Sequence, residues 1–371
     1  MHETFTRYLA EVRSSLWTAD NERWNIPSEK LNALIAMHIQ QGTGALVFPM
    51  LLDRAELPAV IRRQMKGVCM HTMQQHVALQ HTLDKAWAAL IKAGIQPVLL
   101  KGAGLAALYA SPEQRPWGDI DLFVGKKQYH PACAAMRDTF PTALKFDEEL
   151  DHYKHYNLIA DGISIEVHRV SMGLQHPIDE RRYARFEAYA MSHPLPVSLS
   201  SLTVMVPEPT FNALFVMMHS WEHMLTNGSN VRQLCDLALL LHHYADKIDR
   251  LRLRHYLRAL HMMDVWRLFM YVLVRDLGLP EQEAPFFAVE DGLKKRAERL
   301  MSDLLSGRLV PPEERPITSG NRFARKIKTM QGRMRNAQRI QAYSPSYARH
   351  MKIETILHGA LRLFAKDRHW E

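Results

Sequence analysis

Two aspartates stand one residue apart inside the apolar run "GDIDLFV". If this run is a strand, Asp119 and Asp121 point to the same face, while Ile120 and Leu122 point into a core. Two carboxylates held side by side in a half-buried site repel each other. A divalent cation removes that repulsion, and Mg²⁺ prefers carboxylate oxygens as ligands. The spacing therefore predicts a site for Mg²⁺ or Mn²⁺ that serves phosphoryl chemistry.

A third carboxylate follows in the segment "HYNLIADGISIEVH", which alternates apolar and polar residues around a turn. Asp161-Gly162 is a strong two-residue turn signal, so the segment predicts a β-hairpin. In its second strand Glu166 and His168 point away from the apolar side chains. We expect Glu166 to complete the metal site and His168 to lie beside it without binding the metal directly. A cross-strand salt bridge from Glu166 to a nearby lysine or arginine is the alternative.

A turn of small residues precedes the acids. Lys101, Gly102, Ala103 and Gly104 follow the β-prone run "IQPVLL" and open a helix-like segment. Backbone N–H groups at the start of a helix bind phosphate, and residues without bulk let the phosphate approach. The turn therefore predicts a phosphate-binding loop, to which Lys101 and Arg115 add positive charge. Structural ion pairs are the alternative for both cations.

Together these motifs resemble the nucleotidyltransferases of the polymerase-beta-like superfamily, in which a small-residue turn precedes an Asp-x-Asp strand and a later acidic strand. The closer resemblance is to a bacterial family usually labelled uncharacterised nucleotidyltransferases. It rests on residues 100–102 (LKG), 115–122 (RPWGDIDL), 165–168 (IEVH) and 232–236 (RQLCD), and it covers most of the chain. Ala103 departs from the wider superfamily, which has glycine or serine at that position.

The resemblance implies an enzyme that uses Mg²⁺ or Mn²⁺ to move a nucleoside monophosphate from an NTP to an acceptor, with release of pyrophosphate. Asp119, Asp121 and Glu166 would hold the metal ions, and Glu166 would help to deprotonate the nucleophile. The turn at Gly102 would bind the β and γ phosphates. The acceptor stays open between a small molecule, a protein and RNA. Antitoxin-paired and abortive-infection nucleotidyltransferases share a similar block, so an RNA-directed enzyme is one alternative, and an inactive nucleotide-binding module is another.

The helical part contains "HSWEH", which matches the H-x-x-E-H pattern of some zinc proteases. On a helix His219 and His223 share one face, as two zinc ligands must. With 20 histidines in the chain such a pattern arises by chance, and no third-ligand motif follows it. We expect both histidines to line the cleft or to pack in its core, with a zinc protease as the alternative. Arg232 and Asp236 predict an intrahelical ion pair or a part of the cleft wall.

The elements that must position these residues form an α+β fold, with a small mixed sheet between two helical regions. Residues 1–93 favour helices, and residues 94–195 contain four or five predicted strands and form the nucleotidyltransferase core. Residues 196–310 predict a helical domain, and residues 311–371 predict a basic helical tail. The repeated β-α units of a large doubly wound sheet are absent from the pattern.

Composition bounds the class of protein. The chain has 371 residues, of which 47% are hydrophobic and 23% are charged, as in an ordinary soluble globular protein. No stretch of about 18 apolar residues predicts a membrane span, and the first residues do not resemble a signal peptide. The three cysteines are widely spaced and fit a reducing compartment, so we expect a cytoplasmic protein.

The net charge of +8 is concentrated near the C-terminal end, where residues 315–371 hold 13 Lys and Arg against 3 Asp and Glu. Apolar residues recur there at spacings of three and four, at Phe323, Ile327, Met330, Met334 and Ala337. Such a stripe predicts a helix that packs onto the protein and presents its charges around the cleft or on the outer face. The charges leave a nucleic-acid contact open as an alternative.

Overall fold

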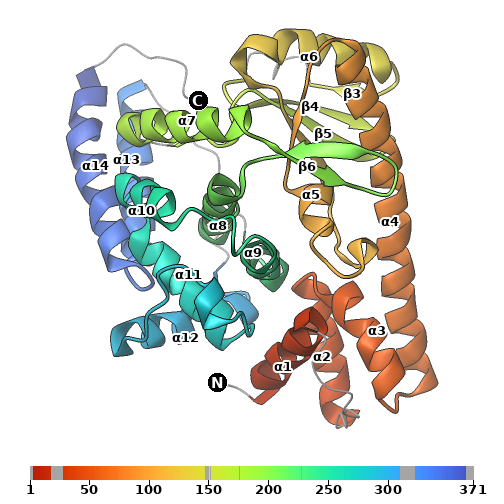
Figure 1. Cartoon of the computed structure of the whole chain (residues 1–371). Helices are drawn as coiled ribbons and strands as arrows, with labels where there is room; N and C mark the ends of the chain where they lie inside the picture. The colour runs from red at the N-terminus through yellow and green to blue at the C-terminus, as the bar shows by residue number, and fades with distance from the viewer. Residues whose placement is uncertain are drawn as a thin grey trace.

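The computed structural model shows an α+β protein in which one small mixed sheet is flanked by helices, as the sequence predicts (Figure 1). The structure describes residues 3–17, 28–146, 150, 152–174, 176–226, 228–309 and 322–364. In the view of Figure 1 the first three helices of the chain lie below the sheet, the long fourth helix runs along its right side, and the C-terminal helices lie to its left.

Four helices form the N-terminal region: α1 (Glu3–Trp17), α2 (Ser28–Gln40), α3 (Gly44–Arg54) and α4 (Ala59–Lys92). The apolar stripe of α2 is buried, with side chains at most 4% exposed at Leu31, Leu34, Ile35 and His38. Helix α4 ends just before Gly94, whose φ of 74° lies in the left-handed region that favours glycine. The C-terminal half of α4 packs against the sheet and so joins the N-terminal helices to the core.

The sheet has five strands in the order β1-β2-β5-β4-β3. They are β1 (Val98–Leu100), β2 (Asp119–Phe123), β3 (Leu144–Lys145), β4 (His155–Ala160) and β5 (Ile163–His168). Strands β2 and β5 run parallel, whereas the other neighbours pair antiparallel. The predicted hairpin is confirmed: Asp161 and Gly162 connect β4 to β5, and both have positive φ, as a tight hairpin turn requires.

Short helices connect β1, β2 and β3. Helix α5 (Gly102–Ala106) and the 3₁₀ turn η1 (Pro112–Gln114) lead from β1 to β2, and α6 (Gly125–Thr139) follows β2. The run "KKQYHPACAAMRDTF" predicts a helix with Pro131 at or near its start, but the helix begins at Gly125, six residues earlier. Gly125 causes this difference, because its φ of 72° turns the chain out of β2 directly into the helix.

Strand periodicity gives the sheet one apolar and one polar face. The apolar face is covered by α4 and α6 and carries the fully buried side chains of Ile120, Leu122, Ile165 and Val167. The polar face carries the acids of β2 and β5. Because these two strands are parallel and in register, Asp121 lies directly beside Glu166. The sheet thus orients the acids by burying their sequence neighbours.

A second hairpin extends the strand-bearing part of the chain beyond its predicted end. Strands β6 (Leu195–Ser198) and β7 (Thr203–Val206) pair antiparallel, and β7 packs against β1. We expected the core to end at residue 195 and to hold four or five strands. The described residues instead contain seven strands and reach Val206 before the helices resume. The short and partly polar β6 gave too weak a pattern to be recognised.

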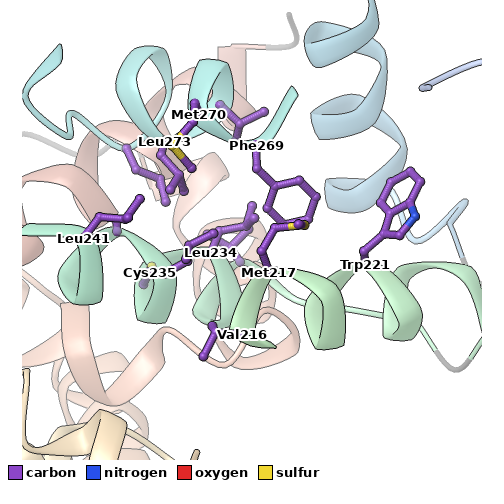
Figure 2. Close-up of a cluster of buried hydrophobic side chains, with 14 of the residues drawn as sticks. Val216, Met217, Trp221, Leu234, Cys235, Leu241, Phe269, Met270 and Leu273 are labelled. Carbon is purple, nitrogen blue, oxygen red and sulfur yellow. The ribbon is translucent and has the colours of Figure 1, made fainter. Parts of the chain in front are cut away.

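The C-terminal helices enclose the larger apolar core. They are α7 (Pro177–Ser192), α8 (Pro209–Leu225), α9 (Val231–His243), α10 (Arg250–Ala259), α11 (Met263–Arg275) and α12 (Asp291–Leu305), with the 3₁₀ turn η3 (Glu281–Glu283) between the last two. Figure 2 shows Met217 of α8 and Leu234 of α9 lying beneath Phe269 of α11. Helices α8 and α9 therefore form the centre of this core, between the sheet and the outer helices (Figure 1).

The basic tail folds into α13 (Arg322–Ile340) and α14 (Pro345–Phe364), which pack against each other. On the predicted stripe Ala337 is fully buried, and Met330 and Met334 are half-buried. The side chain of Phe323 lies outside the described residues. Arg339 donates a hydrogen bond to the carbonyl oxygen of Leu225, so α13 is docked on the protein as predicted. In the part of the chain that the structure describes, no helix is long and apolar enough to cross a membrane.

The contact between α5 and β7 generates a stability prediction. A Cβ at Gly104 would meet Cγ1 of Val206 at 2.9 Å, and this valine is buried. Gly104→Ala should therefore lower the free energy of unfolding by about 1–3 kcal/mol. Gly67→Ala is the matched control, because nothing lies within 4 Å of a Cβ there. Alanine favours the interior of α4, so Gly67→Ala should raise stability by up to about 1 kcal/mol.

Denaturant unfolding of both variants, followed by circular dichroism, measures the two changes. Opposite signs are expected for the two glycines. Unchanged or raised stability in Gly104→Ala would contradict the close approach of α5 to β7.

Candidate active site

Three carboxylates meet on the polar face of the sheet. Asp119 and Asp121 come from β2 and Glu166 comes from β5, and one oxygen of each lies within 4.8 Å of the others. Asp121 is fully buried, whereas the side chain of Glu166 is 21% exposed. The structure therefore brings together the three predicted acids, with the open side of the group at Glu166.

Two basic side chains contact the buried Asp121. Lys101 Nζ lies 3.0 Å from Asp121 Oδ2, and His168 Nε2 lies 3.0 Å from Asp121 Oδ1 and 3.0 Å from Glu166 Oε2. Burial alone would lower the pKa of Lys101, but Asp121, Asp119 and Glu166 outweigh it and raise that pKa. Burial likewise opposes the charged form of His168, and its carboxylate partners raise its pKa. Lys101 therefore forms a structural ion pair, which was the alternative to a phosphate contact in the sequence analysis.

The acids have an incomplete set of partners, which suits a divalent cation. Repulsion from Asp121, followed by burial, raises the pKa of Asp119 above its ordinary value. Asp121 Oδ2 is buried and receives no hydrogen bond of good geometry in the described structure, although the Lys101 ammonium lies near it. All three donors are carboxylate oxygens, the ligand type that Mg²⁺ and Mn²⁺ prefer. The residues present therefore fit such an ion.

His155 is a member of the site that the sequence analysis missed. It lies opposite His168 in the β4–β5 pairing, and its Nδ1 is 3.7 Å from Glu166 Oε2. Burial, opposed by Glu166, lowers the pKa of His155 to about 4. The predicted alternatives for Glu166 were lysine or arginine, but the partners are these two histidines. Counting back across the Asp161-Gly162 turn would have placed His155 opposite His168.

The small-residue turn packs against Trp117 and the core under the sheet. Lys101 and Gly102 have φ of 52° and 43°, and a Cβ on Gly102 would lie 3.2 Å from the Trp117 ring. Ala103 is 1% exposed and belongs to the apolar cluster under the sheet, so its methyl group points into the core. Alanine at position 103, where the wider superfamily has glycine or serine, therefore adds a contact in the core. The prediction that the turn binds phosphate stays a prediction.

Arg115 lies in a different place from the one expected of a phosphate ligand. Its Nε and Nη2 donate to the two carboxylate oxygens of Asp236 at 2.7 and 2.8 Å, and its Nη1 donates to the carbonyl oxygen of Gly102 at 3.1 Å. The side chain is only 3% exposed. With its donors engaged inside the protein, Arg115 supports the turn from behind rather than facing a nucleotide.

Several hydrogen-bond donors contact Asp236 at the buried junction between α9 and the turn after β1. Tyr109 Oη donates to Asp236 Oδ1 at 2.8 Å, and Arg232 Nη1 lies 3.4 Å from Oδ2, which is the predicted pair four residues apart on α9. Burial would raise the pKa of Asp236, but the Arg115 guanidinium outweighs it and holds that pKa below its ordinary value. These contacts join α9 to the turn between β1 and α5.

His219 and His223 share one face of α8, as predicted, with ring centroids 4.3 Å apart. His219 Nε2 lies 3.4 Å from Lys101 Nζ, so α8 reaches the cationic side of the acidic site. Burial, followed by the charge of Lys101, lowers the pKa of both histidines. Among the residues that the structure describes, no group of three possible metal ligands includes either histidine. A neighbouring ammonium also opposes a zinc ion, so the geometry favours a cleft-lining role.

Comparison with known proteins supplies one match. A family model described as an uncharacterised nucleotidyltransferase matches residues 27–277. That range contains the sheet, the acidic site and helices α8 and α9. No curated protein and no solved structure matches the chain.

The buried junction generates the second prediction. Asp236→Asn removes the counter-charge of Arg115 while keeping the size of the side chain. Because the guanidinium then stays buried without a charged partner, the free energy of unfolding should fall by about 3–5 kcal/mol. Arg308→Gln is the control: it breaks a pair with Asp303 in which the arginine is 61% exposed, and such pairs contribute at most about 1 kcal/mol. Denaturant unfolding measures both, and equal losses in the two variants would refute the junction's role.

Proposed function

The chain belongs to the uncharacterised nucleotidyltransferase family, and we propose that it transfers a nucleoside monophosphate from an NTP to an acceptor with release of pyrophosphate. The observation that carries this proposal is the group of three carboxylates within 4.8 Å on one face of the sheet. In the reaction an acceptor oxygen forms a bond to the α-phosphorus, the bond between that phosphorus and the α–β bridging oxygen breaks, and pyrophosphate leaves. The proton of the acceptor goes to a base in the site.

Asp119, Asp121 and Glu166 would hold Mg²⁺ or Mn²⁺. When bound, the ion neutralises the phosphate charge and lowers the pKa of the attacking group. The side chain of Glu166 is 21% exposed, and its histidine partner outweighs burial and lowers its pKa. It is therefore ionised at neutral pH and can accept the proton of the nucleophile.

Lys101 supports the proposal from the opposite side of the acids. Its ammonium is 3.0 Å from Asp121 and its side chain is 16% exposed, so it faces both the buried carboxylate and the open side of the site. We assign two roles to Lys101. It neutralises Asp121 before substrate binds, and it attracts the NTP phosphates. The turn at Gly102–Gly104 would contact the β and γ phosphates through backbone N–H groups.

The proposal leaves the acceptor to experiment. A small molecule, a protein side chain and an RNA end are chemically equivalent oxygen nucleophiles for this site. The exposed charges of α13, such as Arg335, keep RNA among them. We propose a cytoplasmic location, where NTPs are available and where Cys69, Cys133 and Cys235, none of which forms a disulfide, remain reduced.

The function is tested by incubating the protein with each α-phosphate-labelled NTP, Mg²⁺ and a fractionated lysate. Label should move to one fraction with release of pyrophosphate. Digestion of that fraction with nuclease or protease then identifies the acceptor as RNA, protein or small molecule. Absence of transfer with every NTP, with either Mg²⁺ or Mn²⁺, would argue for an inactive nucleotide-binding module.

Neutral replacements of the aspartates give the third prediction. Asp119→Asn and Asp121→Asn should reduce the transfer rate at least about 1000-fold, because an amide cannot balance the charge of the metal ion. Asp138→Asn is the matched control, since Asp138 is exposed on α6, the helix that covers the apolar face of the sheet. Circular dichroism should show all three variants folded. Transfer at the wild-type rate in either Asp119→Asn or Asp121→Asn would remove these acids from the mechanism.

A further inference from the structure

A second group of metal-binding side chains lies away from the acids of the sheet. Asp179 is in the first turn of α7, His261 is in the turn between α10 and α11, and His350 is on α14. One possible ligand atom of each lies within 4.8 Å of the others. Three elements far apart in the sequence therefore converge on one point.

The Asp179 carboxylate is the centre of the group. Its Oδ2 lies 2.9 Å from His350 Nε2 and 3.4 Å from His176 Nδ1, whereas its Oδ1 faces Arg182 at 3.3 Å. In a tetrahedral zinc site with bonds of 2.0–2.1 Å, neighbouring ligand atoms are about 3.3 Å apart. His350 Nε2 and Asp179 Oδ2 lie closer than that distance, as in a hydrogen bond, so a bound ion would move these two atoms apart by a few tenths of an ångström. The oxygen that faces the arginine is the other one.

His261 completes the set from the solvent side. Its ring stacks on the His350 ring with centroids 3.9 Å apart, so a shared ion requires the His261 ring to turn. His261 is exposed, and its side chain has the room to make that turn. The needed adjustment thus falls on the least restrained member of the group.

We propose that Asp179, His261 and His350 bind a Zn²⁺ ion. Two imidazoles and one carboxylate suit a borderline-soft transition metal, whereas the three carboxylates of the sheet offer the oxygen ligands that suit Mg²⁺. Nothing in this inference depends on the activity proposed for the sheet.

The ion would fix one wall of a cavity. A cavity of about 180 Å³ lies between α7, α8 and the α13–α14 pair, and its lining includes His176, Asp179, His350 and Glu354. Glu354 forms an ion pair with His176 and so orients that imidazole toward Asp179. A zinc ion at Asp179 would connect α14 to α7 and hold the C-terminal helices over this cavity. Its role is that of a structural clamp.

The test uses the full-length protein, purified without chelators, incubated with Zn²⁺ and dialysed against metal-free buffer. Elemental analysis should find about one zinc per chain in the wild type. Zinc affinity should fall at least tenfold in His261→Ala and in His350→Ala. His71→Ala, which removes an exposed histidine of α4, should leave the zinc content unchanged. Replacement of zinc by Co²⁺ should give the visible absorption bands of a tetrahedral site.

Two further variants separate this site from the others. His261→Ala keeps the test valid if His350→Ala fails to fold, because His261 is exposed. Asp121→Asn and His219→Ala should both retain the zinc. A wild type that holds no zinc after dialysis overturns the proposal. So does zinc that persists in His261→Ala and His350→Ala, or that is lost in Asp121→Asn or His219→Ala. The experiment measures zinc content and zinc affinity alone, so a change in nucleotidyl transfer in any variant does not affect its outcome.

Discussion

Repulsion among carboxylates is the constraint around which the site is organised. Asp119, Asp121 and Glu166 are held on one face because their sequence neighbours are buried on the other face of the sheet. Asp121 has no access to water, so its charge must be balanced inside the protein. Lys101 and His168 supply that balance at 3.0 Å each. The strands hold the acids in place, and Lys101 and His168, at the ends of β1 and β5, offset part of their negative charge.

Residues of both the sheet and the helical domain hold the acidic site in place. Arg115 connects the turn after β1 to Asp236 on α9, and His219 brings α8 to Lys101. Both helices are central to the larger apolar core, as Figure 2 shows for Met217 and Leu234. The geometry of the acidic site therefore depends on how the helical domain packs against the sheet. Neither part holds the complete set of polar contacts alone.

Local patterns predicted much of this arrangement. The alternation in "GDIDLFV" and the Asp161-Gly162 turn predicted the strands, their faces and the meeting of the acids, because strand periodicity is a short-range property. The helical spacing of Leu31, Leu34, Ile35 and His38 predicted α2, and the apolar stripe of the tail predicted the docking of α13. Strands β6 and β7 were not among the predicted strands: each has only four residues, and β6 is partly polar.

Long-range partners could not be predicted in the same way. Arg115 and Asp236 are 121 residues apart, and nothing in the spacing of either residue points to the other. An arginine beside a phosphate-binding pattern gives the same sequence whether it faces a ligand or a buried carboxylate. The stacking of His261 on His350 could not be predicted from local spacing either, because it depends on how α14 packs against the α10–α11 turn.

The register between β2 and β5 also limits how the gene can change in length. Asp121 and Glu166 are neighbours only while both side chains project from the same face. A single-codon insertion in β5 ahead of Glu166 would turn its carboxylate toward α6 and expose an apolar side chain in its place. Insertions of any size in the loops outside these strands leave that parity intact. Ahead of Glu166 within β5, by contrast, an odd-numbered insertion removes the acidic site even though every original residue is retained.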